Sequence, residues 1–163
     1  MTLQQPDDVG LTTVAGDRRY ATSLDMFERH RRLVPGGSQT NSKRPAGYAF
    51  GHYPIFARRA RGSHVWDVDG HEYVDYVLAL GPIVLGYADP AVDGAIRAQL
   101  ERGIVYGLLA EVELAAAEAV VGAVPGAEQV RFLKSGAEAT SAAARIARAS
   151  TGREVIVNCG YRG

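Results

Sequence analysis

The chain has 163 residues, with 18 basic and 18 acidic side chains that give a formal net charge of zero, and 47% of its residues are hydrophobic. This length predicts one compact domain, and the balanced charge argues against a large nucleic-acid or anionic-membrane footprint, since either needs a basic excess. The single cysteine, Cys159, excludes an internal disulfide framework, and neither a signal peptide nor an apolar run of membrane-spanning length is visible. We therefore expect a soluble protein of the cytoplasm.

The N-terminal part predicts one helix followed by a loop. Residues 1–20 are polar, and from Ala21 apolar side chains recur at helical spacing until a Pro-Gly-Gly sequence at residues 35–37 ends the pattern. A polar and aromatic loop follows. We expect residues 1–53 to form a lead-in, helix and loop, and residues 54–163 to form a hairpin and the first part of a larger domain.

Strand and turn signals come next. Residues 55–61 and 64–68 have strand composition, an Asp-Gly turn follows at residues 69–70, and residues 72–77 return as a partner strand. The pattern predicts antiparallel pairing around these turns.

Two helices are expected after the hairpin. Asp89 suits the N-cap of the first helix and Pro90 its first helical position. Apolar side chains four residues apart predict one buried face on this helix, made of Val92, Ile96 and Leu100. A second helix is expected over residues 111–123, which a Pro-Gly sequence ends.

The last third predicts a β–turn–α–β unit. Residues 129–133 form an expected strand, residues 138–149 an Ala-rich helix, and residues 154–159 a second apolar strand. This order is the unit of a parallel sheet covered by helices. Such a sheet would be left with exposed edges, so we expect the domain to continue beyond Gly163.

The turn between the first of these strands and the Ala-rich helix is a candidate phosphate site. Gly136 and Ala137 open the helix, where free N–H groups and the positive end of the helix dipole attract anions, and Ser135 adds a hydroxyl. An ordinary βα turn that needs a glycine is the alternative. The nucleotide-binding motifs G-x-x-x-x-G-K-[ST] and G-x-G-x-x-G are absent.

Tyr161 follows the second expected strand and could stack on a planar ligand, although a tyrosine that packs under a loop gives the same pattern. A phosphate grip and an aromatic platform at neighbouring strand ends suit a phosphorylated aromatic cofactor. No metal site is expected, because alternation sends the acidic and histidine side chains of the hairpin to different faces. These side chains are His64, Asp67, Asp69, His71 and Asp75.

Several ordered motifs resemble one family. The run VRFLKSGAEATSAAARIARASTGREVIVNCGYRG at residues 130–163, the hairpin HVWDVDGHEYVDY and the loop VPGGSQTNSKRP are similar to segments of class III pyridoxal-phosphate-dependent aminotransferases. Within that family they resemble the branch of glutamate-1-semialdehyde 2,1-aminomutase and its aminotransferase relatives. The resemblance implies an α/β fold of the fold type I transferases, present here as the N-terminal arm and an incomplete mixed or parallel sheet with helices.

The resemblance also implies roles for particular residues. Ser135, Gly136 and Ala137 would hold the phosphate of pyridoxal 5′-phosphate, and Tyr161 would stack on its ring. Thr40 and Lys43 would face the carboxylate of the substrate. Ala137 stands where the family usually has threonine, Arg162 where it has histidine, and Leu80 where the aminomutases have tryptophan.

The implied activity is amino-group transfer between a small amino donor and an aldehyde or ketone, in a homodimer. Intramolecular transfer by an aminomutase is one alternative, and a non-catalytic phosphate-binding or dimerisation remnant is another. No catalytic residue is expected within the chain, because the lysine that forms a Schiff base with the cofactor would follow Gly163 in this family. We therefore expect this chain alone to be inactive.

Overall fold

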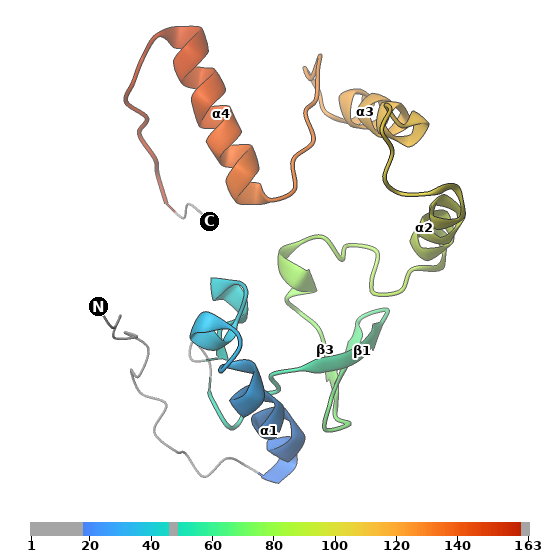
Figure 1. The fold of residues 1–163 in the computed structure, drawn as a ribbon, viewed down its shortest axis with the longest axis vertical. Helices are drawn as coiled ribbons and strands as arrows, with labels where there is room; N and C mark the ends of the chain where they lie inside the picture. Colours follow the sequence, from blue (N-terminus) through green and yellow to red (C-terminus); the bar gives the residue numbers. More distant parts are fainter. Residues whose placement is uncertain (1–17, 46–48, 161–163) are drawn as a thin grey trace. The chain divides into compact units, whose positions relative to one another are not determined.

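The computed structural model describes residues 18–45 and 49–160 (Figure 1). The chain divides into two compact units, Met1–Arg102 and Gly103–Gly163, whereas its length predicted a single domain. The division expected between residues 53 and 54 falls inside the first unit and stays a prediction.

The first unit begins with a short 3₁₀ turn, η1 (Arg18–Tyr20), and helix α1 (Ala21–His30). The helix starts where the sequence predicted. Two further 3₁₀ turns, η2 (Pro35–Gly37) and η3 (Asn41–Lys43), follow in the loop. Gly37 has a φ of +67°, and a Cβ placed there would lie 2.7 Å from the ring of Phe27, so the loop packs this closely on α1 only with glycine.

A three-stranded antiparallel sheet follows, in the order β1 (Ala57–Arg61), β2 (His64–Asp67), β3 (Glu72–Val74) (Figure 1). This confirms the predicted hairpin. Gly70 in the β2–β3 turn has a φ of +96°, which explains the Asp-Gly signal. In the same turn the N–H of Gly70 donates to the carbonyl of Asp67 at 3.3 Å.

Asp75 closes the base of the loop that follows β3. One of its carboxylate oxygens accepts hydrogen bonds from the N–H groups of Val77 (2.7 Å) and Leu78 (3.3 Å), and the other accepts from the Tyr87 hydroxyl (2.7 Å). The bond from Tyr87 lowers the pKa of the Asp75 carboxyl. Within the loop, the 3₁₀ turn η5 (Leu78–Leu80) has positive φ at all three residues, a strained conformation for residues with side chains.

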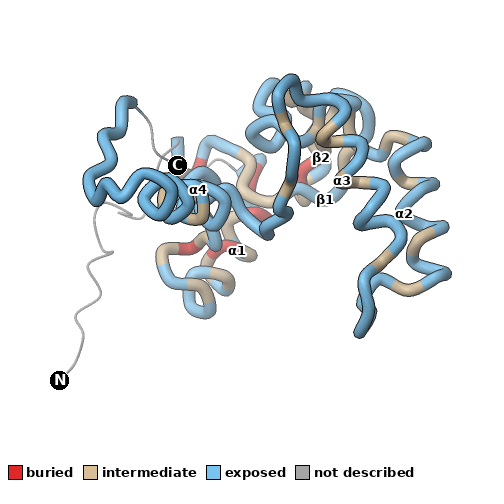
Figure 2. Tube along the Cα trace, turned by 90° about the horizontal axis from the view of Figure 1, so that it is seen from above, coloured by how far each residue is buried: buried red, intermediate tan, exposed pale blue. Residues whose placement is uncertain are grey.

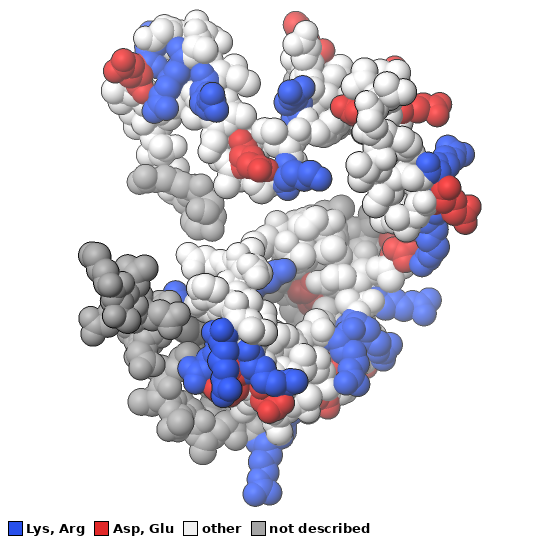
Figure 3. All heavy atoms as spheres, viewed as in Figure 1, with Lys and Arg blue, Asp and Glu red and all other residues white. Residues whose placement is uncertain are grey.

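Helix α2 (Pro90–Arg102) begins as predicted, because Asp89 Oδ1 accepts from the N–H groups of Ala91 and Val92, both at 3.0 Å. Figure 3 shows basic and acidic side chains next to one another over this helix. Arg97 and Asp93 of α2 form an ion pair at 3.1 Å.

The prediction that α2 has a buried face is wrong. Val92 is 44% exposed and both Ile96 and Leu100 are 54% exposed. The spacing of these side chains is that of a helix that faces a core. Among the described residues, however, no helix or strand covers them enough to bury them.

The second unit contains α3 (Glu111–Ala123) and α4 (Gly136–Thr151). The first has the predicted bounds. The second starts two residues earlier than predicted and ends at Thr151, followed by Gly152 with a φ of +68°. The strands predicted at residues 129–133 and 154–159 are not formed (Figure 1). A strand exists only by pairing with a neighbour, and within the described residues neither segment has one.

Burial separates the two units. Every buried side chain among the described residues belongs to the first unit, in or next to α1, in the loop that follows it and at the end of β2, whereas residues 103–160 are exposed or intermediate (Figure 2). The apolar side chains of Leu108, Leu109 and Val155 are each more than 80% exposed. In the part of the chain that the structure describes, no helix combines the length and apolar character needed to cross a membrane.

Candidate functional site

The N-terminus of α4 is organised by a capping box. The Ser135 hydroxyl accepts from the N–H of Glu138 (3.3 Å) and donates to Glu138 Oε2 (3.1 Å), and that carboxylate oxygen also accepts from the N–H of Ser135 (2.9 Å). The two residues therefore satisfy each other's backbone donors, as a Ser-x-x-Glu sequence allows.

This arrangement leaves two donors at the start of the helix. Neither Gly136 nor Ala137, which lie between the capping residues, gives its N–H to an acceptor among the described residues. Gly136 and Ala137 are both exposed, and apart from its chain neighbours and the nearby backbone of α4, no described atom lies within 4 Å of the position of a Cβ at Gly136. Two adjacent N–H groups at the positive end of a 16-residue helix fit a phosphate group.

The predicted cofactor residues thus differ in what the structure shows of them. Gly136 and Ala137 present free N–H groups, but the Ser135 hydroxyl, expected as a further donor to the phosphate, already donates to Glu138. Tyr161 lies outside the described residues. The neighbouring Lys134 is exposed. The sequence pattern Ser-x-x-Glu at residues 135–138 could have revealed the capping box.

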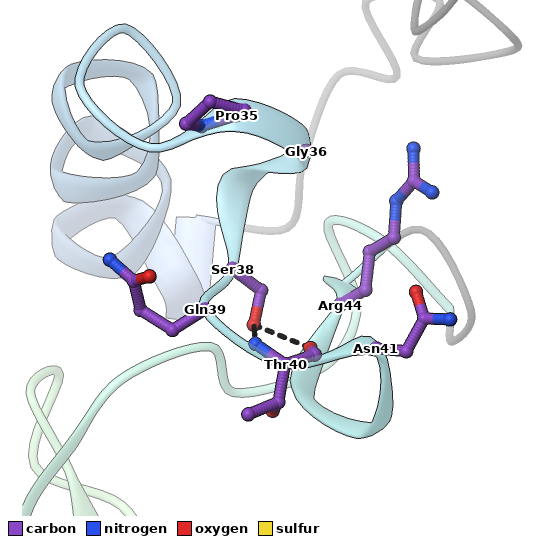
Figure 4. A pocket seen from close by; sticks show the side chains of 7 residues that line it. All are labelled: Pro35, Gly36, Ser38, Gln39, Thr40, Asn41 and Arg44. Carbon is purple, nitrogen blue, oxygen red and sulfur yellow. Dashed lines mark hydrogen bonds between the residues drawn. The ribbon is translucent and has the colours of Figure 1, made fainter. Parts of the chain in front are cut away.

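A second candidate site lies in the loop after α1, in the first unit. It is a pocket of about 290 Å³ with a polar lining (Figure 4). The lining residues are Pro35, Gly36, Ser38, Gln39, Thr40, Asn41 and Arg44. The Ser38 hydroxyl donates to the carbonyl of Thr40 (2.8 Å) and accepts from its N–H (3.3 Å), which fixes the curve of the loop around the pocket.

Of the two predicted substrate residues, Thr40 lines this pocket and the exposed Lys43 does not. The next residue, Arg44, lines it instead and is half-buried. In Figure 4 the side chains of Asn41 and Arg44 extend on the same side of the loop. Lys43 is the last residue of the 3₁₀ turn Asn41–Lys43, and Arg44 follows it directly. Sequence reasoning missed Arg44, although a guanidinium is the better partner for a carboxylate.

Asp67 is the centre of a buried polar cluster under the β2–β3 turn. It is 1% exposed and accepts hydrogen bonds from the N–H of His71 (2.8 Å), from His71 Nδ1 (2.9 Å) and from the Tyr73 hydroxyl (2.9 Å). Burial raises the pKa of the Asp67 carboxyl, but these hydrogen bonds outweigh burial and the pKa is lowered. Burial, together with the bond to Asp67, raises the pKa of Tyr73.

Asp69, in the same turn, reaches α1. Its two carboxylate oxygens accept from the N–H groups of Thr22 (2.7 Å) and Ser23 (3.0 Å). Burial raises the pKa of the Asp69 carboxyl, and the bonds with Ser23 and Thr22 outweigh burial and lower it. The acidic side chains of the hairpin therefore serve as hydrogen-bond acceptors, and no group of three metal-binding side chains occurs in residues 18–45 and 49–160.

Comparisons with known proteins identify the family of the chain. The model of the family "Aminotransferase class-III" matches residues 48–163. The chain is 47% identical over 145 residues to a glutamate-1-semialdehyde 2,1-aminomutase of Chloroflexus aggregans, a match that covers 89% of this chain and 32% of that protein.

Solved structures share the fold. An omega-transaminase from Sphaerobacter thermophilus superposes with a TM-score of 0.75 and 37% identity over 84% of this chain, and a transaminase with PLP bound gives 0.73 and 33% over 82%. The match covers 31% of the first structure and 30% of the second, so the chain spans about a third of the length of these relatives. The expected fold type I assignment is confirmed.

Proposed function

Because the chain belongs to the class III aminotransferase family, we propose that it provides the cofactor-phosphate site of a pyridoxal 5′-phosphate enzyme that transfers an amino group between small molecules. One solved relative binds this cofactor, which supports the choice of ligand. When bound, the cofactor supplies an electron-withdrawing ring that stabilises negative charge on the substrate carbon. The proposal concerns the protein that carries this segment, which is expected to be a homodimer of the cytoplasm.

The observation that carries the proposal is the pair of free N–H groups at Gly136 and Ala137. The capping box occupies the donors on either side of them, so a phosphate would meet two parallel N–H groups held in fixed positions. The positive end of α4 adds to this attraction. Tyr161 has the role of stacking on the cofactor ring, and Ser135 contributes by holding the turn rather than by donating its own hydroxyl proton.

The pocket after α1 is assigned to the carboxylate of the substrate. Thr40 and Arg44 line it, and the fork of Arg44 can bind a carboxylate through two parallel hydrogen bonds. Lys43 lies beside this pocket in sequence and adds positive charge nearby. A carboxylate-bearing amino donor or acceptor is therefore the substrate class that this loop fits.

Intramolecular transfer by an aminomutase is the second candidate reaction, favoured by the name of the Chloroflexus relative. The two reactions differ in whether a separate amino donor is consumed. A non-catalytic role remains the third candidate, because the sequence contains two lysines, Lys43 and Lys134, and both are exposed. Neither lies in the buried pocket in which a reactive lysine amine is usually held.

Two substitutions at one position test the phosphate site. Gly136→Pro removes one N–H but suits the first turn of a helix, and the extended backbone of Ser135 (φ −140°, ψ 158°) accepts a following proline. Gly136→Ala keeps the N–H and places its Cβ in open space. We expect Gly136→Pro to weaken pyridoxal 5′-phosphate binding about tenfold, measured by calorimetric titration, and Gly136→Ala to change it little. Equal affinity of both variants would contradict the proposed site.

A further inference from the structure

Helix α1 has no cap from its own segment. Tyr20, at the N-cap position, makes no side-chain hydrogen bond to the helix. The acceptor comes instead from Asp69 in the β2–β3 turn, which takes the N–H groups of Thr22 and Ser23, 47 and 46 residues away in sequence. These are the second and third helical N–H groups, the two that an N-cap side chain normally satisfies. The carboxylate also lies at the positive end of the helix.

The surroundings of Asp69 hold this contact in place. The ring of Tyr20 packs edge-on against His71 with centroids 5.5 Å apart, and His71 is bound to the buried Asp67. Ser23 is fully buried and Tyr20 is 7% exposed. The N-terminus of α1 is therefore fixed to the sheet by both a charge-assisted cap and an aromatic contact.

The other end of α1 carries the pocket loop. Phe27, which is 2% exposed, packs so closely on Gly37 that a Cβ there would lie 2.7 Å from its ring. The N–H of Gly37 donates to the carbonyl of Val34 at 2.9 Å. Gly36 and Ser38, the residues on either side of Gly37, both line the pocket. A change in the position of α1 is therefore passed to the loop through Phe27.

We infer that Asp69 is a positioning residue for the carboxylate pocket, acting through α1 on Thr40 and Arg44. The inference rests on the proposed role of that pocket. Asp69 is not among the residues that line the pocket. Its effect is to fix the helix on whose buried face the pocket loop packs, so that the polar atoms of the loop keep one arrangement.

Three variants of the full chain separate positioning from simple capping. Asp69→Ala removes the cap, and Asp69→Asn keeps an oxygen that can accept one helix N–H. Asp89→Ala is the matched control, because Asp89 makes the same two bonds to its own helix, α2, at 3.0 Å each. Glutarate serves as the carboxylate probe, and ¹⁵N relaxation of the Lys43 and Arg44 amides reports the order of the loop without any ligand.

We expect Asp69→Ala to weaken glutarate binding about fivefold or more and to lower the order parameters at Lys43 and Arg44. Asp69→Asn should keep most of the glutarate affinity and most of the order at Lys43 and Arg44. Asp89→Ala should change neither the affinity nor the order. A folded Asp69→Ala chain with unchanged order at Lys43 and Arg44 would overturn the inference. If the unsubstituted chain binds no glutarate, the proposed carboxylate site is wrong, and the relaxation data still decide the role of Asp69.

Discussion

Two helix N-termini in this chain are capped in opposite ways. In the first unit, α1 is capped by Asp69 from a distant turn, and the contact belongs to a buried polar cluster. In the second unit, α4 is capped by residues three apart in its own segment, and every side chain around it is at least partly exposed. The difference shows that the first unit depends on long-range contacts, whereas the helices of the second are specified locally.

The largest expected effect is at Asp67. Asp67→Ala would leave His71 and Tyr73 without their buried acceptor, and we expect a loss of about 3 kcal/mol in the unfolding free energy of the first unit. The only tryptophan, Trp66, lies in β2, so urea unfolding followed by its fluorescence reports this unit. A loss below about 1 kcal/mol would show that the cluster is not what holds the unit together.

A smaller effect is expected where the loop packs on α1. Gly37→Ala forces a Cβ against Phe27 at a φ of +67°, so we expect about 2 kcal/mol of destabilisation by the same fluorescence measurement. Gly70→Ala is the control, since its φ of +96° is also unfavourable but no atom lies within 4 Å of the added Cβ. Its cost should be about 1 kcal/mol. Equal costs would mean that Phe27 moves aside freely.

Acid should loosen the first unit in particular. The pKa values of Asp67, Asp69 and Asp75 are all lowered by hydrogen bonds in the folded chain, so their contribution to stability is complete above the ordinary value of 3.8. It is lost as the pH falls below 3.8 and through the lowered folded values. Urea midpoints by Trp66 fluorescence should therefore decrease below about pH 4, and Asp69→Asn should flatten that decrease. A urea midpoint independent of pH would contradict the stabilising role of these three carboxylates.

The smallest effect is expected at the local cap. Ser135→Ala removes the capping box and should cost α4 about 1 kcal/mol, seen as faster amide hydrogen exchange in the first turns of that helix. Ser141→Ala, on the exposed surface of the same helix, is the control and should leave exchange unchanged or slower. Trp66 unfolding should be the same in both variants, and a change there after Ser135→Ala would argue against local specification of α4.

The sequence predicted local features well for a physical reason. The bounds of α3, the Asp89 cap and the Asp-Gly turn depend on residues next to one another, and those signals are short-range. The Asp69 cap could not be predicted in this way, because it joins residues 47 apart that only the folded sheet brings together. The expected strands at residues 129–133 and 154–159 failed for the complementary reason, since a strand also needs a partner.

The two candidate sites also differ in how far local sequence could predict them. Gly136 and Ala137 were identified from a helix start and a family resemblance, and the free N–H groups found there are a local property of the capping box. The pocket after α1 required the fold, because the spacing of Lys43 and Arg44 in the sequence does not reveal which of them lines it. The phosphate turn and the substrate role of Lys43 stay predictions from the resemblance, and Arg44 as a lining residue comes from the structure alone.

The most direct measurement is a comparison of pyridoxal 5′-phosphate with pyridoxal, which lacks the phosphate, followed through the amide resonances of Gly136 and Ala137. The N–H groups of Ala91 and Val92, already bonded to Asp89, provide an internal reference. Our account predicts saturable shifts at Gly136 and Ala137 with the phosphorylated ligand and none with pyridoxal. Equal shifts with both ligands, or shifts only at other amides, would contradict a phosphate site at the start of α4.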